Sequence, residues 1–153
     1  MKIKSIIFTL IIISLSIVAF PQNCRTFAKK KCLPEILPYV HDGQYNVTTL
    51  APGESAQMYM TFYSGQEYKV IACADDALGE KVILRIKDAN NRILYDNSKN
   101  NYANWWSFNV KASQQLIIEV SVPATNNEAD KNSVGCVSIM VGFMNTEKTI
   151  QKM

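Results

Sequence analysis

The chain has too few metal-binding and nucleophilic motifs to form a familiar catalytic site. It contains one histidine, His41, no Cys-x-x-Cys pair and no Gly-x-Ser-x-Gly motif. A structural zinc site needs four cysteine or histidine ligands, usually at short spacings, which this sequence does not offer. His41 and Asp42 are neighbours in a His-Asp-Gly turn, where two side chains rarely point at one substrate, so we interpret them as turn residues. The sequence therefore predicts a protein that is not an enzyme.

The basic residues of the sequence also do not form a long continuous stripe. The one run is Lys29-Lys30-Lys31, which a solvated helix face explains. A nucleic-acid-binding protein is expected to carry a longer basic stripe or patch. Two of the lysines behind the net charge of +3 are Lys2 and Lys4, at the very N-terminus. We therefore predict no nucleic-acid partner.

The N-terminus has the pattern of a secretory signal peptide. Lys2 and Lys4 precede a mostly apolar run over residues 6–20. A retained membrane anchor is one alternative, but it usually needs about 20 apolar residues, whereas this run has about 15. A lipid anchor on Cys24 is another, against which the bulky, polar Asn23 argues. The sequence predicts that residues 1–22 are removed, that no stable membrane span remains, and that the exported protein is periplasmic, at the cell surface or extracellular.

The four cysteines all lie in the exported part, and an even number in an oxidising compartment predicts two disulfides. Residues 23–43 are predicted to form a cysteine-containing helical arm and connector, with a helix from Cys24 to Cys32 that Pro34 ends. Such a helix separates its two cysteines by about 12 Å, too far for a bond that needs Cα atoms within about 7 Å. Each would then pair with Cys73 or Cys136, which fastens the arm at two points. If the helix is absent, the pairs become Cys24–Cys32 and Cys73–Cys136.

The remaining sequence alternates apolar and polar residues, which is typical of half-buried antiparallel strands. Eight short strands with turns between them predict an all-β fold, an antiparallel β-sandwich of jelly-roll type, over residues 44–144. A flexible tail is expected at residues 145–153. The expected strands cover residues 45–50, 56–63, 66–73, 81–87, 92–95, 105–110, 115–122 and 134–143.

Part of this pattern resembles a known family. The segments GQEYKV, VILRIKDANNRILYD and GCVSIMVGF, with a tryptophan strand before the last, are similar to the pre-peptidase C-terminal type of bacterial secreted β-sandwich domain. Its strand-turn-strand motif is matched by Leu84, Ile86, Asp88 and Leu94. The resemblance covers about residues 44–144. It implies a non-catalytic accessory module of exported proteins, one that sometimes binds calcium or polymeric substrates.

Oxygen-bearing side chains gather around one expected hairpin. Asp88, Asn90 and Asp96, with Asn91 and Asn97 beside them, are of the type that Ca²⁺ takes as ligands. Asp and Asn are also the residues that tight turns require for backbone reasons alone. A calcium site and ordinary turn chemistry are therefore the two interpretations, and no other cofactor is indicated.

Tyr95, Tyr102, Trp105 and Trp106 form the densest aromatic group. If the strand alternates, Trp106 faces inward and Trp105 faces outward. Exposed aromatics of this kind stack on sugars or anchor protein partners, so Tyr95, Tyr102 and Trp105 are the candidate ligand-binding residues. The alternative is that the arm or the opposite sheet edge covers Trp105.

The sequence as a whole predicts an exported, non-catalytic binding or accessory module of the bacterial envelope or extracellular space, with a protein or glycan partner. Two alternatives stay open. One is a carbohydrate-binding module that uses its exposed aromatics. The other is a structural subunit of an envelope assembly whose edge strands pair with a neighbour.

Overall fold

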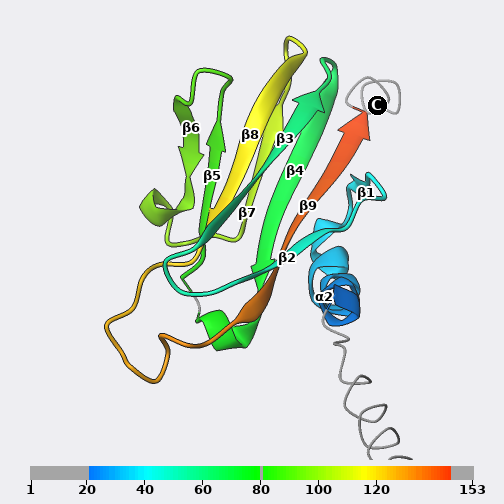
Figure 1. Cartoon of the computed structure of the whole chain (residues 1–153). Coiled ribbons are helices and arrows are strands. Elements are labelled where there is room, and N and C mark those ends of the chain that lie inside the picture. Colours follow the sequence, from blue (N-terminus) through cyan, green and yellow to red (C-terminus); the bar gives the residue numbers. More distant parts are fainter. Residues whose placement is uncertain (1–20, 80, 146–153) are drawn as a thin grey trace, which may run out of the picture.

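A computed structural model describes residues 21–79 and 81–145 (Figure 1). Most of the expected signal peptide, residues 1–20, and nearly all of the expected tail, residues 146–153, lie outside the described part. Within the described ranges no helix is long and apolar enough to cross a membrane.

Two antiparallel sheets form a β-sandwich of jelly-roll type. The first sheet has the order β2-β9-β4-β7, with β1 also paired to β9, and the second has the order β3-β8-β5-β6. Strands that follow one another in the chain mostly alternate between the sheets, as a jelly roll requires. The prediction of fold class is confirmed, and all eight expected strands are present. The strands are β1 (Val40–His41), β2 (Asn46–Leu50), β3 (Ser55–Phe62), β4 (Gln66–Ala74), β5 (Ile83–Lys87), β6 (Ile93–Asp96), β7 (Trp105–Asn109), β8 (Gln114–Ser121) and β9 (Gly135–Asn145).

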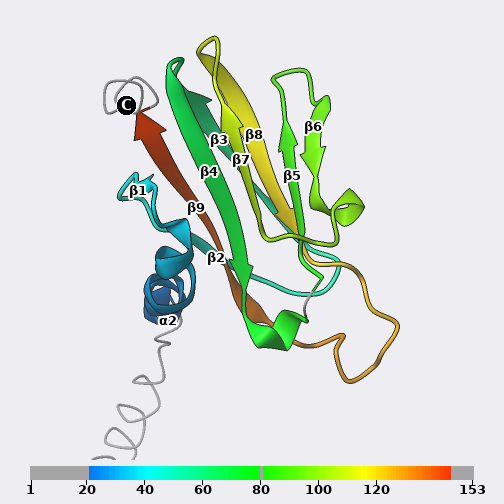
Figure 2. The same cartoon turned by 180° about the vertical axis from the view of Figure 1, so that it is seen from behind.

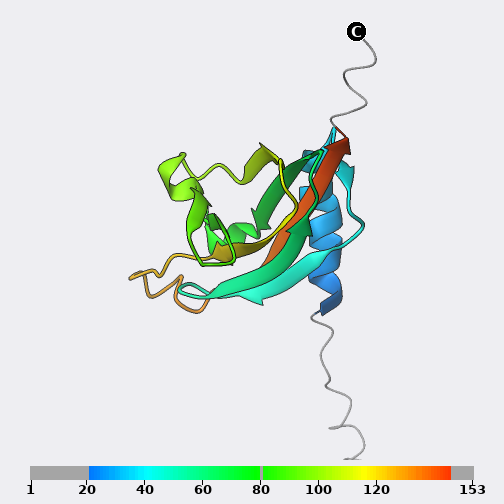
Figure 3. The same cartoon turned by 90° about the horizontal axis from the view of Figure 1, so that it is seen from above.

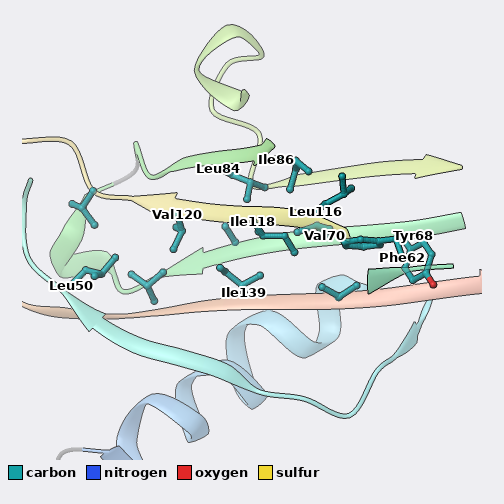
Figure 4. Packing of buried hydrophobic residues seen from close by; sticks show 14 of the residues in the cluster. Leu50, Phe62, Tyr68, Val70, Leu84, Ile86, Leu116, Ile118, Val120 and Ile139 are labelled. Atoms are coloured by element: carbon teal, nitrogen blue, oxygen red, sulfur yellow. The ribbon is translucent and has the colours of Figure 1, made fainter. Parts of the chain in front are cut away.

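The core lies between the inner faces of the two sheets (Figure 4). Alternation places Leu84 and Ile86 of β5 inward while Arg85 and Lys87 face outward, as predicted. The register of β4 against β9 brings Val70 opposite Val141, so that apolar side chains meet across the pair. The largest fully buried core side chains are Phe62, Leu84, Ile86, Leu116, Ile118, Val70, Val120, Val137 and Val141.

The N-terminal arm lies against the outer face of the first sheet, over β4 and β9 (Figures 1 and 3). It consists of the α-helix α2 (Pro21–Phe27), the π-helical turn η1 (Ala28–Cys32) and the 3-10 helix η2 (Leu33–Ile36). The predicted end of the helix at Cys32 agrees with the end of η1, whereas the predicted start was wrong, because Asn23 lies inside α2. Pro34 does not stop all helical structure, because it occupies the first turn of the 3-10 helix η2, where its missing N–H is not needed. A second apolar cluster seals the arm to the sheet and contains Ala28, Cys32, Ile36, Ile71, Cys73 and Met140.

One disulfide fastens the arm to the sandwich. Cys24 of α2 is bonded to Cys136 of β9, with their Cα atoms 5.2 Å apart, which agrees for Cys24 with the prediction that the arm cysteines pair with the sheets rather than with each other. Cys32 and Cys73 are buried, unbonded thiols in this structure, so the second predicted disulfide stays a prediction.

The outer face of the second sheet, whose strands β5 and β6 are labelled in Figure 2, carries a row of ion pairs. Arg85 Nε lies 2.9 Å from Asp96 Oδ2, and Lys87 Nζ lies 2.7 Å from Glu119 Oε2. Burial alone would raise the pKa of Asp96, but hydrogen bonds from Ser98 and Arg85 outweigh it and hold that pKa at about 2. The pKa of Glu119 is lowered in the same way. Burial alone would raise it, but the hydrogen bond with Lys87 helps to outweigh that effect.

Candidate binding surface

Trp105 is the first residue of β7, an edge strand that, among the strands the structure describes, pairs only with β4. Its indole faces outward and is 48 % exposed, whereas Trp106 points into the sandwich. There Trp106 stacks between Tyr95 and Phe108, at centroid distances of 4.9 and 4.3 Å. The predicted alternation of the two tryptophans is therefore confirmed, and neither the arm nor the opposite sheet edge fully covers Trp105.

Lys69 of β4 connects Trp105 to the arm. Its ammonium lies 5.3 Å from the centre of the Trp105 ring and 5.8 Å from the centre of the Tyr39 ring, so a cation sits between two aromatic faces. The same ammonium donates to the carbonyl oxygen of Glu35 at 2.6 Å. These contacts hold Trp105 beside the arm without burying it.

Tyr39 completes the junction between arm and sheet. Its hydroxyl donates to Glu67 Oε1 at 2.5 Å, and partial burial together with this hydrogen bond raises the pKa of Tyr39. We call this region the Trp105 surface. It consists of Trp105, Ser107 and Asn109 of β7 with Lys69, Glu35 and Tyr39 beside them. Lys69, Tyr39 and Glu35 are each held by a hydrogen bond, which restrains the side chains around the indole.

The free edge of β7 presents unpaired backbone groups. Val110 donates its N–H to Gln66, and the carbonyl of Asn104 accepts from Ala72, so the even-numbered residues of this strand face β4. The N–H and C=O groups of Trp105, Ser107 and Asn109 consequently point away from β4. Only the Trp105 carbonyl has a partner among the described residues, the hydroxyl of Tyr95 at 3.3 Å.

A polar cavity of about 390 Å³ opens next to the Trp105 surface, between the arm and the loop that precedes β7. Asn104 Nδ2 donates to Glu35 Oε2 at 2.7 Å at its rim, and Lys31 forms an ion pair with Asp76. Tyr102 contributes its ring, with the Lys81 ammonium 5.7 Å from the ring centre. The cavity is lined by Lys31, Glu35, Ala72, Cys73, Ala74, Asp76, Gly79, Val82, Tyr102 and Asn104.

The three predicted ligand-binding residues do not form one cluster. Tyr102 lies in the loop before β7, and Trp105 is the first residue of β7; both are on the side of the arm. Tyr95 belongs to β6, is half-buried, and lies with its ring on Trp106 at an angle of 8°. Tyr95 therefore packs against the interior and reaches the surface only through its hydroxyl.

The candidate calcium ligands are used by the backbone around them. Asp88 Oδ1 accepts the N–H groups of Asn90 and Arg92, and its other oxygen pairs with the Arg92 side chain. Asp96 caps the turn at Ser98 and pairs with Arg85. In the described residues no three acidic, histidine or cysteine side chains gather as a metal site. These oxygens thus fit the turn interpretation of the sequence.

Asn97, also in the expected calcium set, is turned inward. It is 1 % exposed, accepts from the Leu84 N–H and donates to the carbonyls of Val82 and Ala103. His41, in the other candidate constellation, bonds to the carbonyl of Gln44 within its own turn.

Comparison with known proteins gives little beyond this geometry. No family model matches the chain, and no curated protein matches it. Among solved structures, the chain is similar to the crystal structure of Aeromonas hydrophila PliG, a periplasmic lysozyme inhibitor of g-type lysozyme. The TM-score is 0.48 at 10 % identity, over 70 % of this chain and 89 % of that chain. A similarity of this size transfers no function, and the resemblance to pre-peptidase C-terminal domains stays a prediction.

Sequence reasoning missed the contribution of the arm to this surface. Glu35 and Tyr39 lie in a proline-rich segment that was expected only to connect the arm to the first long strand. Lys69 could have been found, because it faces outward between the inward residues Tyr68 and Val70. Its position next to Trp105 depends on the pairing of β4 with β7, in which Lys69 lies opposite Ser107, and no local pattern specifies that pairing.

Proposed function

We propose that this protein is an exported, non-catalytic binding module that engages a protein partner through the Trp105 surface. The observation that carries the proposal is the half-exposed indole of Trp105 on a strand edge, held in place by Lys69. Tryptophan is among the residues that contribute most binding free energy at protein interfaces, when surrounding groups exclude water from it. A rigid strand also loses less conformational entropy on binding than a mobile loop does.

Export is supported by the bond between Cys24 and Cys136. Disulfides persist in oxidising compartments and are rare in the cytosol. The signal-peptide pattern at the N-terminus supports the same location. The proposed site of action is therefore the cell envelope or the extracellular space.

A protein partner is favoured by the free edge of β7. Backbone N–H and C=O groups at Ser107 and Asn109 can pair with an extended segment of another chain, which adds a strand to the sheet. A side chain of the partner protein would then pack on the Trp105 indole, next to Lys69. A glycan has no regular ladder of donors and acceptors to match this edge.

Photocrosslinking in cells that produce the exported protein tests the proposal. A photoreactive residue in place of Ser107 is expected to give a discrete adduct with another protein. The matched control carries the same group in place of Tyr59, an exposed tyrosine on the outer face of the second sheet. Adducts from position 59 but none from position 107 would refute the assignment of this surface.

A second candidate function is glycan binding, favoured by the polar cavity beside Trp105. Tyr102, Glu35 and Asn104 supply an aromatic ring, a carboxylate and an amide, the groups with which proteins hold sugars. A glycan array distinguishes this alternative. Binding that is lost in both Trp105→Ala and Tyr102→Ala, but kept in Tyr59→Ala, would favour it over the protein partner.

A further inference from the structure

Two buried thiols meet where the arm packs on the first sheet. Cys32, at the end of η1, is fully buried, and Cys73, near the end of β4, is 4 % exposed. Both belong to the apolar cluster that seals the arm to the sheet, together with Ile36 and Met140. Cys32 is the neighbour that contributes most to raising the pKa of Cys73, which agrees with the two thiols lying close together in this cluster.

This thiol pair repeats the arrangement of the disulfide that is already formed. Cys24 lies earlier in the same arm and is bonded to Cys136 of β9. Cys73 of the adjacent strand β4 lies opposite Ser138, two residues along β9 from Cys136. The arm thus faces the sheet with two cysteine pairs side by side, and the bonded pair indicates that the protein encounters oxidising conditions.

We propose that Cys32 and Cys73 form a second disulfide in the exported protein, which ties the arm to β4 as the first ties it to β9. The thiol form of this structure is then the reduced state of that pair. The proposal is independent of the partner that the Trp105 surface binds.

The chemistry balances as thiol–disulfide exchange with an oxidised dithiol oxidase or a small-molecule disulfide. The thiolate of one cysteine attacks the oxidant's disulfide to form a mixed disulfide, and the thiolate of the other displaces the reduced oxidant. Two S–H bonds break and one S–S bond forms, while two electrons reduce the oxidant's disulfide to two thiols, which take up the two protons.

Access to the pair is through the polar cavity, because Cys73 is part of its lining. The neighbouring Cys32 and burial raise the pKa of Cys73, so the folded, reduced protein holds little thiolate there. Exchange is therefore expected to be slow once the arm has packed, and fast in the unfolded chain, where both thiols are solvated.

Peptide mapping of the exported wild-type protein tests the proposal directly. The protein is blocked with an alkylating reagent under denaturing, non-reducing conditions and digested with trypsin. The four cysteines fall in four different peptides, because lysine or arginine separates each from the next. The expected product is residues 32–69 linked to residues 70–81, a species that disappears after reduction.

The first disulfide serves as the control within the same digest. If the Cys24 peptide is linked to residues 132–148 while the peptides of Cys32 and Cys73 are each alkylated, the proposal is overturned. A link between Cys32 and any cysteine other than Cys73 overturns it as well. So does a digest of protein taken from the oxidising compartment in which all four cysteines are alkylated.

Single variants give a second measurement that does not depend on peptide recovery. Cys32→Ser and Cys73→Ser are each expected to expose one alkylatable thiol per molecule in denaturant, where the wild type exposes none. Two thiols in the wild type, falling to one in either variant, would contradict the proposal. The matched control Cys24→Ser is expected to free the thiol of Cys136 alone.

Discussion

Gly142 of β9 lies directly beneath Ile36 of the arm. A Cβ atom at position 142 would be 2.7 Å from Ile36 Cγ1 and 2.8 Å from Tyr39 Cβ, closer than carbon atoms can approach without displacement. Because Tyr39 also bonds to Glu67 and borders Lys69, this close approach determines where the arm meets the Trp105 surface. A glycine with no strained backbone angle is thus required here by space alone.

Gly142→Ala is expected to push the arm off the sheet. Overpacking of this kind typically reduces the free energy of unfolding by about 1–3 kcal/mol, which urea denaturation measures. The matched control is Ser138→Ala on the same outer face of β9. The Ser138 hydroxyl is buried and has no hydrogen-bond partner among the described residues, so its removal is expected to be neutral or slightly stabilising. Equal losses in the two variants would show that the contact beneath Ile36 is not specific.

Asn97 is expected to be among the most sensitive polar residues of the described sandwich. Asn97→Ala leaves the Leu84 N–H and the carbonyls of Val82 and Ala103 without partners, at a loss of about 3 kcal/mol in unfolding free energy. Asn90→Ala, at an exposed turn position, is expected to change it by less than about 0.5 kcal/mol. If added calcium restored the lost stability, the structural role assigned to Asn97 would be contradicted.

Acid titration of stability tests the pair of Asp96 and Arg85. The folded pKa of Asp96, about 2, lies below its ordinary value of 3.8, so the ionised carboxylate stabilises the fold above about pH 4. That contribution, on the order of 2 kcal/mol, is lost as the pH falls from about 4 to 2. The stability difference between wild type and Asp96→Asn should therefore shrink over this range. Glu128→Gln, at an 85 % exposed side chain, is the control and should follow the wild type.

Removing the disulfide tests how firmly the arm is fastened. The bond joins residues 112 positions apart, and a closed loop of that length corresponds to about 4–5 kcal/mol in the chain-entropy account. Cys24→Ala with Cys136→Ala is expected to lower the free energy of unfolding by an amount approaching this figure. Unchanged urea denaturation would mean that the apolar contacts of Ile36 and Ala28 hold the arm by themselves.

The sheets could be predicted because alternation is local information. The two-residue spacing of Leu84 and Ile86 predicts that both lie on the same, inward face of the sheet. Turns such as Ser64-Gly65 mark where the strands end. The two-residue strand β1 escaped prediction because its pairing of Val40 with Phe143 depends on the distant β9. The Trp105 surface was only half predictable for the same reason, since Lys69 and Tyr39 reach it from other elements.

Asn97 shows a different limit of sequence reasoning. In the sequence it is one of several oxygen-bearing residues of a hairpin, indistinguishable from Asp88 or Asn90. In the structure it is buried against three backbone groups, whereas Asn90 is exposed. Side-chain chemistry alone predicts what a residue can bind, whereas the fold decides whether it binds a ligand or its own backbone.

The central claim is that the Trp105 surface binds a protein partner. Its most direct test is the affinity for the partner that is crosslinked through the photoreactive residue at position 107. Its dissociation constant is measured against the wild type, Trp105→Ala and Tyr59→Ala, after circular dichroism has shown that all three are folded. Loss of a tryptophan anchor is expected to weaken binding by about 30-fold, which corresponds to about 2 kcal/mol, while Tyr59→Ala binds as the wild type does. Unchanged affinity in Trp105→Ala, or an equal loss in Tyr59→Ala, would contradict the assignment of the Trp105 surface.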